Sequence, residues 1–136
     1  MDFENAKSKA IKYIGISKKT EFEVRMKLKR LNVDDEIIDE VISYIKELGY
    51  INDSDYVDAY IRQNMRLFSM SIYEMKQKLL QKGIKKYIIE EKLDSLYDTD
   101  YERKVIEKLY LTKFKNMDEM KIKKYLYSKG FTKEEF

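Results

Sequence analysis

The segment Thr20-Glu21-Phe22-Glu23-Val24-Arg25-Met26-Lys27-Leu28 decides the fold, because it can start a helix and bury one face of it. Its first four residues have the form S/T-x-x-E, in which the hydroxyl accepts from the third backbone N–H and the glutamate reaches back to the cap. An apolar stripe follows at four- and three-residue spacings, formed by Val24, Leu28 and Leu31. The segment therefore predicts an amphipathic helix over 20–31.

The same pattern recurs 51 residues later, as Ser71-Ile72-Tyr73-Glu74. At this offset Asn32 falls on Gly83, and both residue types readily adopt the left-handed backbone that ends a helix. The apolar positions also coincide, pairing Val24 with Met75, Leu28 with Leu79, and Ile37-Ile38 with Ile88-Ile89. A third copy begins 47 residues further on, with Asp118 as the cap, Lys121 in place of the glutamate, and Gly130 as the stop. Such repetition is typical of tandem structural units.

Further apolar stripes and capping residues predict helices between these segments. A capping box at Thr99 and Glu102 is expected to start one of them. The full set is three units of three helices, at 2–15, 20–31 and 34–48; 53–68, 71–82 and 85–97; 100–115, 118–129 and a start at 132. We expect an all-α protein of three tandem three-helix repeats, at 1–50, 51–97 and 98–136, that form an elongated, curved body.

The third repeat is incomplete. Phe136 aligns with Ile38 and Ile89, so the equivalents of the later apolar residues Val41, Ile42 and Ile45 are missing. Either the native protein ends here or this chain is truncated, and both interpretations remain open.

The composition excludes several kinds of chemistry. Histidine and cysteine are absent, which removes a Ser-His-Asp triad and a zinc–thiolate site, and the four glycines form no phosphate-binding loop. The acidic residues at 34–36 and 53–55 are explained by helix starts without a metal. No apolar run approaches the roughly 20 residues that cross a bilayer, and the N-terminus lacks a signal peptide's apolar core. We expect a soluble, cytoplasmic protein that is not an enzyme, with no catalytic residue, cofactor or metal.

Four stretches together carry a resemblance to a known family. They are Glu23 to Leu28, Leu48 to Asp53, Glu74 to Ile84 and Lys123 to Phe131, with Tyr56, Ala59 and Arg62 between them. In this order and spacing the chain resembles the RecX regulatory family, the modulators of the RecA recombinase. One departure is the linker Phe68-Ser69-Met70-Ser71, where the family often has glycine. Any close backbone contact at this loop is therefore in doubt, but the fold is not.

The resemblance implies a regulator that binds RecA nucleoprotein filaments and docks in the filament groove. It implies modulation of RecA ATPase, strand exchange, recombination and SOS activity, with inhibition as the expected sign. Several family members also bind DNA, so single- or double-stranded DNA is a second expected partner. The alternative is a helical nucleic-acid-binding protein that acts on DNA directly. We expect a monomer that has no membrane partner.

The candidate partner-binding residues are cations on the predicted helices. Arg25, Lys76 and Lys123 occupy the same position in the three repeats, and the full set is Arg25, Lys29, Arg62, Arg66, Lys76, Lys78, Lys82, Lys123, Lys124 and Lys129. With 28 basic and 25 acidic residues, the alternative is that these cations form a solvated face. Lys82 could instead complement a helix dipole, and Arg62 could pair with Asp58 four residues before it. Tyr125 and Tyr127, interleaved with lysines, are candidate base-stacking residues.

Overall fold

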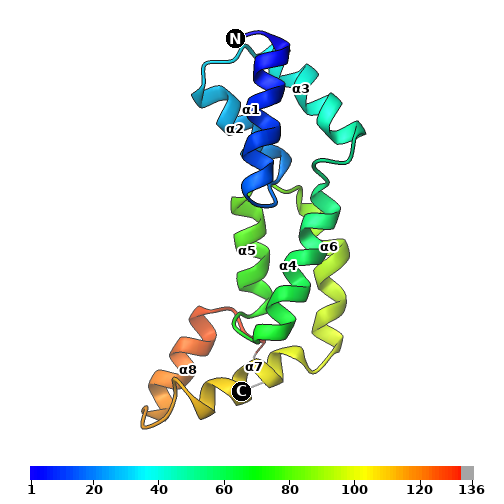
Figure 1. The fold of residues 1–136 in the computed structure, drawn as a ribbon. Helices are drawn as coiled ribbons and strands as arrows, with labels where there is room; N and C mark the ends of the chain where they lie inside the picture. Colours follow the sequence, from blue (N-terminus) through cyan, green and yellow to red (C-terminus); the bar gives the residue numbers. More distant parts are fainter. Residues whose placement is uncertain (133–136) are drawn as a thin grey trace.

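The computed structural model describes residues 1–132, and this part of the chain consists of helices and their connections, without a strand (Figure 1). The all-α prediction is therefore confirmed. The helices are α1 Phe3–Ile16, α2 Glu21–Arg30, α3 Asp35–Glu47, α4 Asp53–Leu67, α5 Ile72–Gln81, α6 Lys86–Leu93, the 3-10 helix η1 Asp94–Asp98, α7 Tyr101–Leu111 and α8 Glu119–Ser128.

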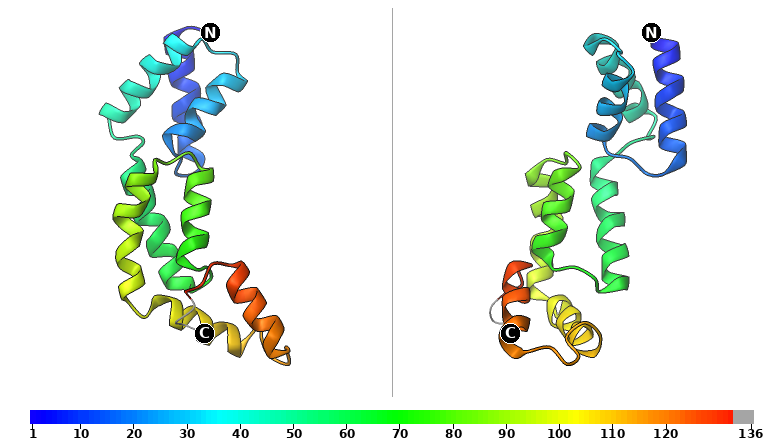
Figure 2. Two further views of the ribbon diagram at one scale, coloured as in Figure 1. Left: turned by 180° about the vertical axis from the view of Figure 1, so that it is seen from behind. Right: turned by 90° about the vertical axis from the view of Figure 1, so that its left-hand side faces the viewer.

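The body is elongated and curved, with the first helices at one end and α7 and α8 at the other (Figure 1). The helices α1, α2 and α3 all pack on one another, while α6 packs on both α4 and α5. The second helix of each predicted repeat, α2, α5 and α8, lies on the same side of the body, where the three follow one another (Figure 2). The division into repeats at 50 and 97 stays a prediction.

Both predicted capping boxes at the second helices are present. Thr20 Oγ1 accepts from the backbone N–H of Glu23 at 3.2 Å, and Glu23 accepts from the Thr20 N–H at 3.0 Å. Ser71 and Glu74 form the same pair of bonds at 3.0 and 3.2 Å. The predicted stops also hold, because positive φ angles of 60°, 78° and 77° occur at Asn32, Gly83 and Gly130.

Three predictions in the C-terminal half need correction. The capping box at Thr99 and Glu102 is wrong, because the Glu102 carboxylate accepts from the backbone of Ile72 instead. The helix expected over 85–97 ends at Leu93 and continues as η1, and the helix expected to reach 115 ends at Leu111. The helix expected to begin at 132 lies, apart from Thr132 itself, on residues outside the described part.

The apolar core divides into two clusters. One extends from Ala6 to Ile51 and is built by α1 to α3 and the segments beside them. The other extends from Val57 to Phe131, so α4 to α8 share one core across the predicted boundary at 97. The core is therefore continuous between the second and third predicted repeats. Between the first and second repeats, the two clusters are separate and the connection depends on other contacts.

Candidate functional site

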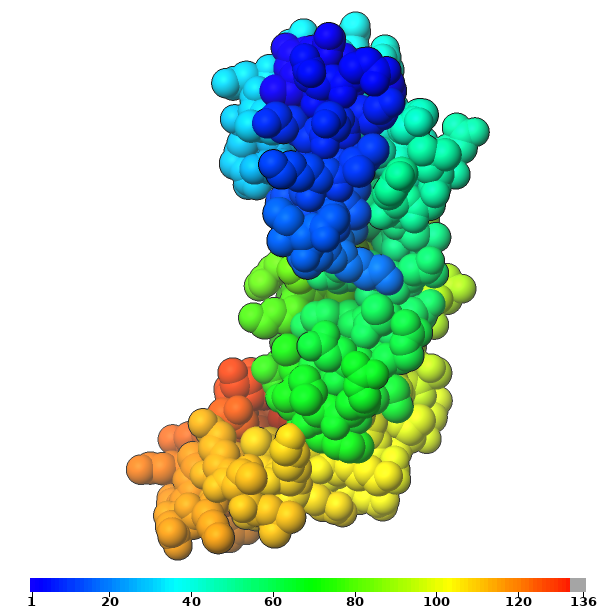
Figure 3. Space-filling model, viewed as in Figure 1, coloured from blue at the N-terminus to red at the C-terminus, as the bar shows by residue number. Residues whose placement is uncertain are grey.

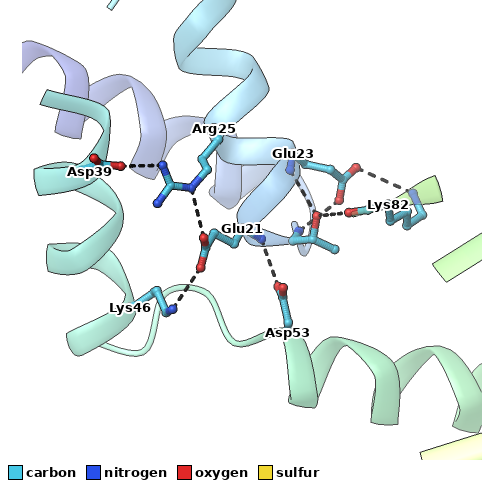
Figure 4. A network of polar contacts seen from close by, with 8 residues as sticks. Glu21, Glu23, Arg25, Asp39, Lys46, Asp53 and Lys82 are labelled. Atoms are coloured by element: carbon cyan, nitrogen blue, oxygen red, sulfur yellow. Dashed lines mark hydrogen bonds and ion pairs between the residues drawn. The ribbon is translucent and has the colours of Figure 1, made fainter. Parts of the chain in front are cut away.

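The start of α2 meets the end of α5 in a polar junction (Figure 4). The fully buried hydroxyl of Thr20 donates to the backbone carbonyl of Lys82 at 2.8 Å, while its oxygen still caps α2. The Lys82 Nζ lies 3.7 Å from the Glu23 carboxylate. The positive end of one helix dipole is thereby joined to the negative end of the next, an arrangement that favours end-to-end stacking.

A cluster of charges supports the same junction (Figure 4). The backbone N–H of Glu21 donates to Asp53 at 3.0 Å, which links α2 to the start of α4. The Glu21 carboxylate holds both Arg25 and Lys46 at 3.0 Å, and Arg25 also reaches Asp39 at 2.7 Å. Burial opposes ionisation of Glu21, but these two cations outweigh it and lower the pKa of its carboxyl. Burial raises the pKa of Asp53, and the negative charges of Glu21 and Glu23 add to the rise, while the Glu21 backbone N–H and the charge of Lys46 only partly oppose it.

The junction is repeated between α5 and α8. The Ser71 hydroxyl donates to the Lys129 carbonyl, and the Lys129 Nζ lies 4.0 Å from Glu74. The buried Glu102 on α7 takes the part of Asp53, accepting from the backbone N–H of Ile72 at 2.9 Å. Sequence reasoning missed these two carboxylates, although each lies near the start of the first helix of the following repeat.

The candidate residues Arg25, Lys76, Lys82 and Lys129 make ion pairs within the chain. Arg25 pairs with α3 through Asp39, and Lys76 pairs with α6 through Glu90 at 3.0 Å. The two acidic partners, Asp39 and Glu90, are again 51 residues apart, so this ion pair between helices recurs with the sequence repeat. The three equivalent cations Arg25, Lys76 and Lys123 therefore differ in their ion pairing. The first two are paired, whereas Lys123 is exposed and has no ion pair within the described residues.

The other candidate cations are exposed and form no ion pair in the described part of the chain: Lys29, Arg62, Arg66, Lys78, Lys123 and Lys124. Four of them lie on α2, α5 and α8, the helices that share one side of the body (Figure 2), and the two arginines lie on α4. The suggested pairing of Arg62 with Asp58 is wrong, because Asp58 pairs with Lys92 at 3.0 Å.

Tyr125 is half-buried at the end of the body. Its ring packs edge-on against Phe114 at 5.5 Å between centroids, and Lys113 lies 4.9 Å from its centre. Because Phe114 and Lys113 already contact the ring, this packing argues against the prediction that Tyr125 stacks on a base. No described helix is long and apolar enough to span a membrane.

Comparisons with known proteins point to one family. The family model of the first three-helix domain of RecX matches residues 6–44, which include α2 and most of α3. The regulatory protein RecX of Streptococcus agalactiae strain NEM316 is 38% identical over 130 residues, covering 92% of this chain and 50% of its own length. That of Clostridium beijerinckii is 38% identical and is covered over 65% of its length. The chain thus spans about half to two thirds of these relatives.

Solved structures have the same architecture. The crystal structure of RecX from Lactobacillus salivarius is similar with a TM-score of 0.81 and 28% identity, over 98% of this chain and 91% of that one. A second crystal structure of regulatory protein RecX matches with a TM-score of 0.86 at 23% identity, covering 98% of this chain and 70% of that one. The second likeness shows the fold.

Proposed function

The chain belongs to the RecX family of regulatory proteins, and from this premise we propose that it modulates a RecA recombinase by docking along the RecA nucleoprotein filament. It acts by binding, without catalysis of its own. The expected effect is restraint of RecA ATPase and strand exchange.

The observation that carries this proposal is the row of second helices on one side of a long body. The exposed lysines Lys29, Lys78, Lys123 and Lys124 are distributed along this row. Because successive repeats place them at successive positions along the body, several weak contacts with an acidic surface can form at once and add their effects. A curved body with this distribution suits the groove of a helical filament.

The test is the rate of ATP hydrolysis by RecA on single-stranded DNA. We expect the chain to slow hydrolysis at amounts well below one chain per RecA protomer. No effect at equimolar chain would overturn the proposal.

The docking side has its own test. Charge reversal of Lys78, Lys123 and Lys124 together should weaken the effect on RecA. The control is reversal of three lysines elsewhere, Lys9, Lys12 and Lys115, which gives a variant of the same net charge as the first. Equal activity of the two folded variants would contradict docking through the row of second helices.

Direct action on DNA is the second candidate, and salt separates it from docking on protein. A binder of DNA phosphates loses affinity steeply with the logarithm of salt concentration because it releases counterions. Filament docking that also buries apolar surface should lose less. A slope as steep for RecA filaments as for bare DNA would favour direct action.

A further inference from the structure

A groove of about 360 Å³ lies between the α1–α2 loop and α4, beside the polar junction. Lys18 and Lys19 line it from the first repeat, and Tyr56, Tyr60, Gln63 and Lys82 line it from the second. Figure 3 shows the face of the molecule on which the end of α1 meets α4. The groove therefore lies between the two apolar clusters, where the first and second repeats are joined by polar contacts.

Lys19 is the unusual member of this groove, because it is buried, with only 9% of its surface exposed. Its ammonium donates to the backbone carbonyl of Ser17 at 3.0 Å and to the Ser17 hydroxyl, and it lies 4.7 Å from the centre of the Tyr13 ring. No carboxylate of the described residues pairs with it. A buried charge is costly unless an opposite charge compensates it, so this ammonium favours an anion in the groove.

The other charges around the groove add to the same imbalance. Glu23 is the one carboxylate among the described residues that line the groove, and it is already bound to Lys82 and to the backbone of Thr20. Lys18 is exposed and has no ion pair with any described residue, and the ammonium of Lys27 lies 5.5 Å from the Tyr13 ring that Lys19 also approaches. Local positive charge thus accumulates at one place in a chain whose total is only +3.

We propose that this groove binds a phosphate group, held by Lys18 and Lys19 from the first repeat and by Lys82 and Gln63 from the second. The three ammonium groups and Glu23 leave an excess of about two positive charges, which balances a phosphate monoester of charge about −1.5 to −2 at neutral pH and more than balances one singly charged backbone phosphodiester. The Gln63 amide and the Tyr56 hydroxyl supply neutral donors. The ligand is defined by this chemistry, and its source is either a free phosphate or the phosphate of a nucleotide or nucleic acid.

The test is a titration of the isolated chain, followed by backbone amide NMR signals. Inorganic phosphate, a nucleoside monophosphate and an oligo-dT strand are titrated separately, with sulfate-free buffer of constant ionic strength. We expect saturable shifts at residues 17–19, 56 and 63 with at least one of the three. Shifts with the free ions identify a small anion as the ligand, and shifts with the oligonucleotide alone identify the nucleic-acid backbone. No saturable shift at these residues with any probe overturns the proposal.

Substitutions make the assignment specific. Lys19→Gln should weaken binding by about tenfold, because it removes a charged donor, and Lys18→Gln by about threefold, because that lysine is exposed. The second variant is Gln63→Glu, which places a carboxylate in the groove and should abolish phosphate binding. Because position 63 is exposed, this substitution should not disturb folding. The matched control is Lys9→Gln on α1, the helix that precedes the loop. It changes the net charge by one unit, as Gln63→Glu does. Equal affinity of Gln63→Glu and Lys9→Gln would overturn the proposal. This readout does not involve RecA, so it is independent of the docking proposal.

Discussion

The ring of Phe22, at the start of α2, lies directly against the backbone of Gly83 at the end of α5, in the space that a side chain on that glycine would fill. Gly83 has a φ of +78°, so its position demands glycine both for its backbone conformation and for this contact. Tyr73 and Gly130 form the same pair at the next junction, where φ is +77°. Asn32, at the equivalent place in the first repeat, also has positive φ, at 60°.

Gly83→Ala should therefore destabilise the fold by more than its backbone strain. The left-handed backbone costs about 1–2 kcal/mol for a residue with a Cβ. Forcing the methyl against Phe22 adds about 1–3 kcal/mol, as overpacking does. The free energy of unfolding, measured with urea, checks this.

Gly49→Ala is the matched control for that measurement. Gly49 has a φ of +79°, but no other described residue has an atom within 4 Å of the position that its Cβ would occupy. This variant should lose only the backbone strain of about 1–2 kcal/mol. Equal losses for the two variants would show that the contact between Phe22 and Gly83 adds nothing to stability.

Glu102→Gln should cost about 1–3 kcal/mol of stability. The buried carboxylate accepts from the N–H of Ile72 at 2.9 Å, and from the N–H and hydroxyl of Thr132 at 3.2 and 2.8 Å. A glutamine offers one acceptor oxygen and an amide group that only donates, so at least one buried donor loses its partner.

The control for Glu102→Gln is Glu107→Gln, the same chemical change on the exposed face of α7. Glu107 lies 3.7 Å from Arg103, and both side chains are more than half exposed, so its loss should cost less than about 1 kcal/mol. Urea unfolding compares the two, and equal midpoints would mean that the Glu102 bonds contribute little to the junction.

How much the sequence predicts depends on the distance between the residues that interact. The caps at Thr20 and Ser71 and the stops at Gly83 and Gly130 were predictable, because each uses groups within a few residues. The bond from Glu21 to Asp53 joins residues 32 apart, and nothing in the local pattern of either predicts it. Thr99 and Glu102 fit the capping pattern equally well, yet the tertiary contact with Ile72 prevailed over the local one.

The candidate cations illustrate the same limit. Spacing placed Arg25, Lys76 and Lys123 at equivalent positions, but only the packing of α2 on α3 and of α5 on α6 revealed the carboxylates opposite the first two. One signal was available in the sequence, because Asp39 and Glu90 are offset by the same 51 residues as Arg25 and Lys76.

Tyr101→Phe should change how stability depends on pH at the alkaline end. Burial raises the pKa of Tyr101 to about 12, and its hydroxyl donates to the Met70 carbonyl at 2.6 Å. The un-ionised Tyr101 hydroxyl stabilises the folded state fully below the unfolded pKa of about 10. This stabilisation is lost as pH rises toward 12, because in that range the tyrosine ionises readily only in the unfolded state. At pH 8 the phenylalanine variant should be about 1 kcal/mol less stable than the parent chain, because it lacks the hydrogen bond to Met70.

Urea unfolding at a series of pH values from 8 to about 11 measures this effect. The difference in stability between the parent chain and Tyr101→Phe should shrink above pH 10, whereas a constant difference would contradict a raised pKa at Tyr101. Other tyrosines with raised pKa, among them Tyr56 and Tyr60, are common to both proteins and cancel in the difference.

Arg25→Gln and Lys123→Gln should separate a structural cation from one available to a partner. Arg25 bridges α2 and α3 through Glu21 and Asp39, so its loss should cost about 1 kcal/mol, a small value because both pairs are partly exposed. Lys123 is exposed without an ion pair in the described chain, so its loss should change stability by less than about 0.5 kcal/mol. If the row of second helices docks on RecA filaments, Lys123→Gln should weaken the slowing of ATP hydrolysis more than Arg25→Gln does. Urea unfolding and the ATPase assay together measure both effects, and a greater loss of regulation from Arg25→Gln in a folded protein would contradict this division of roles.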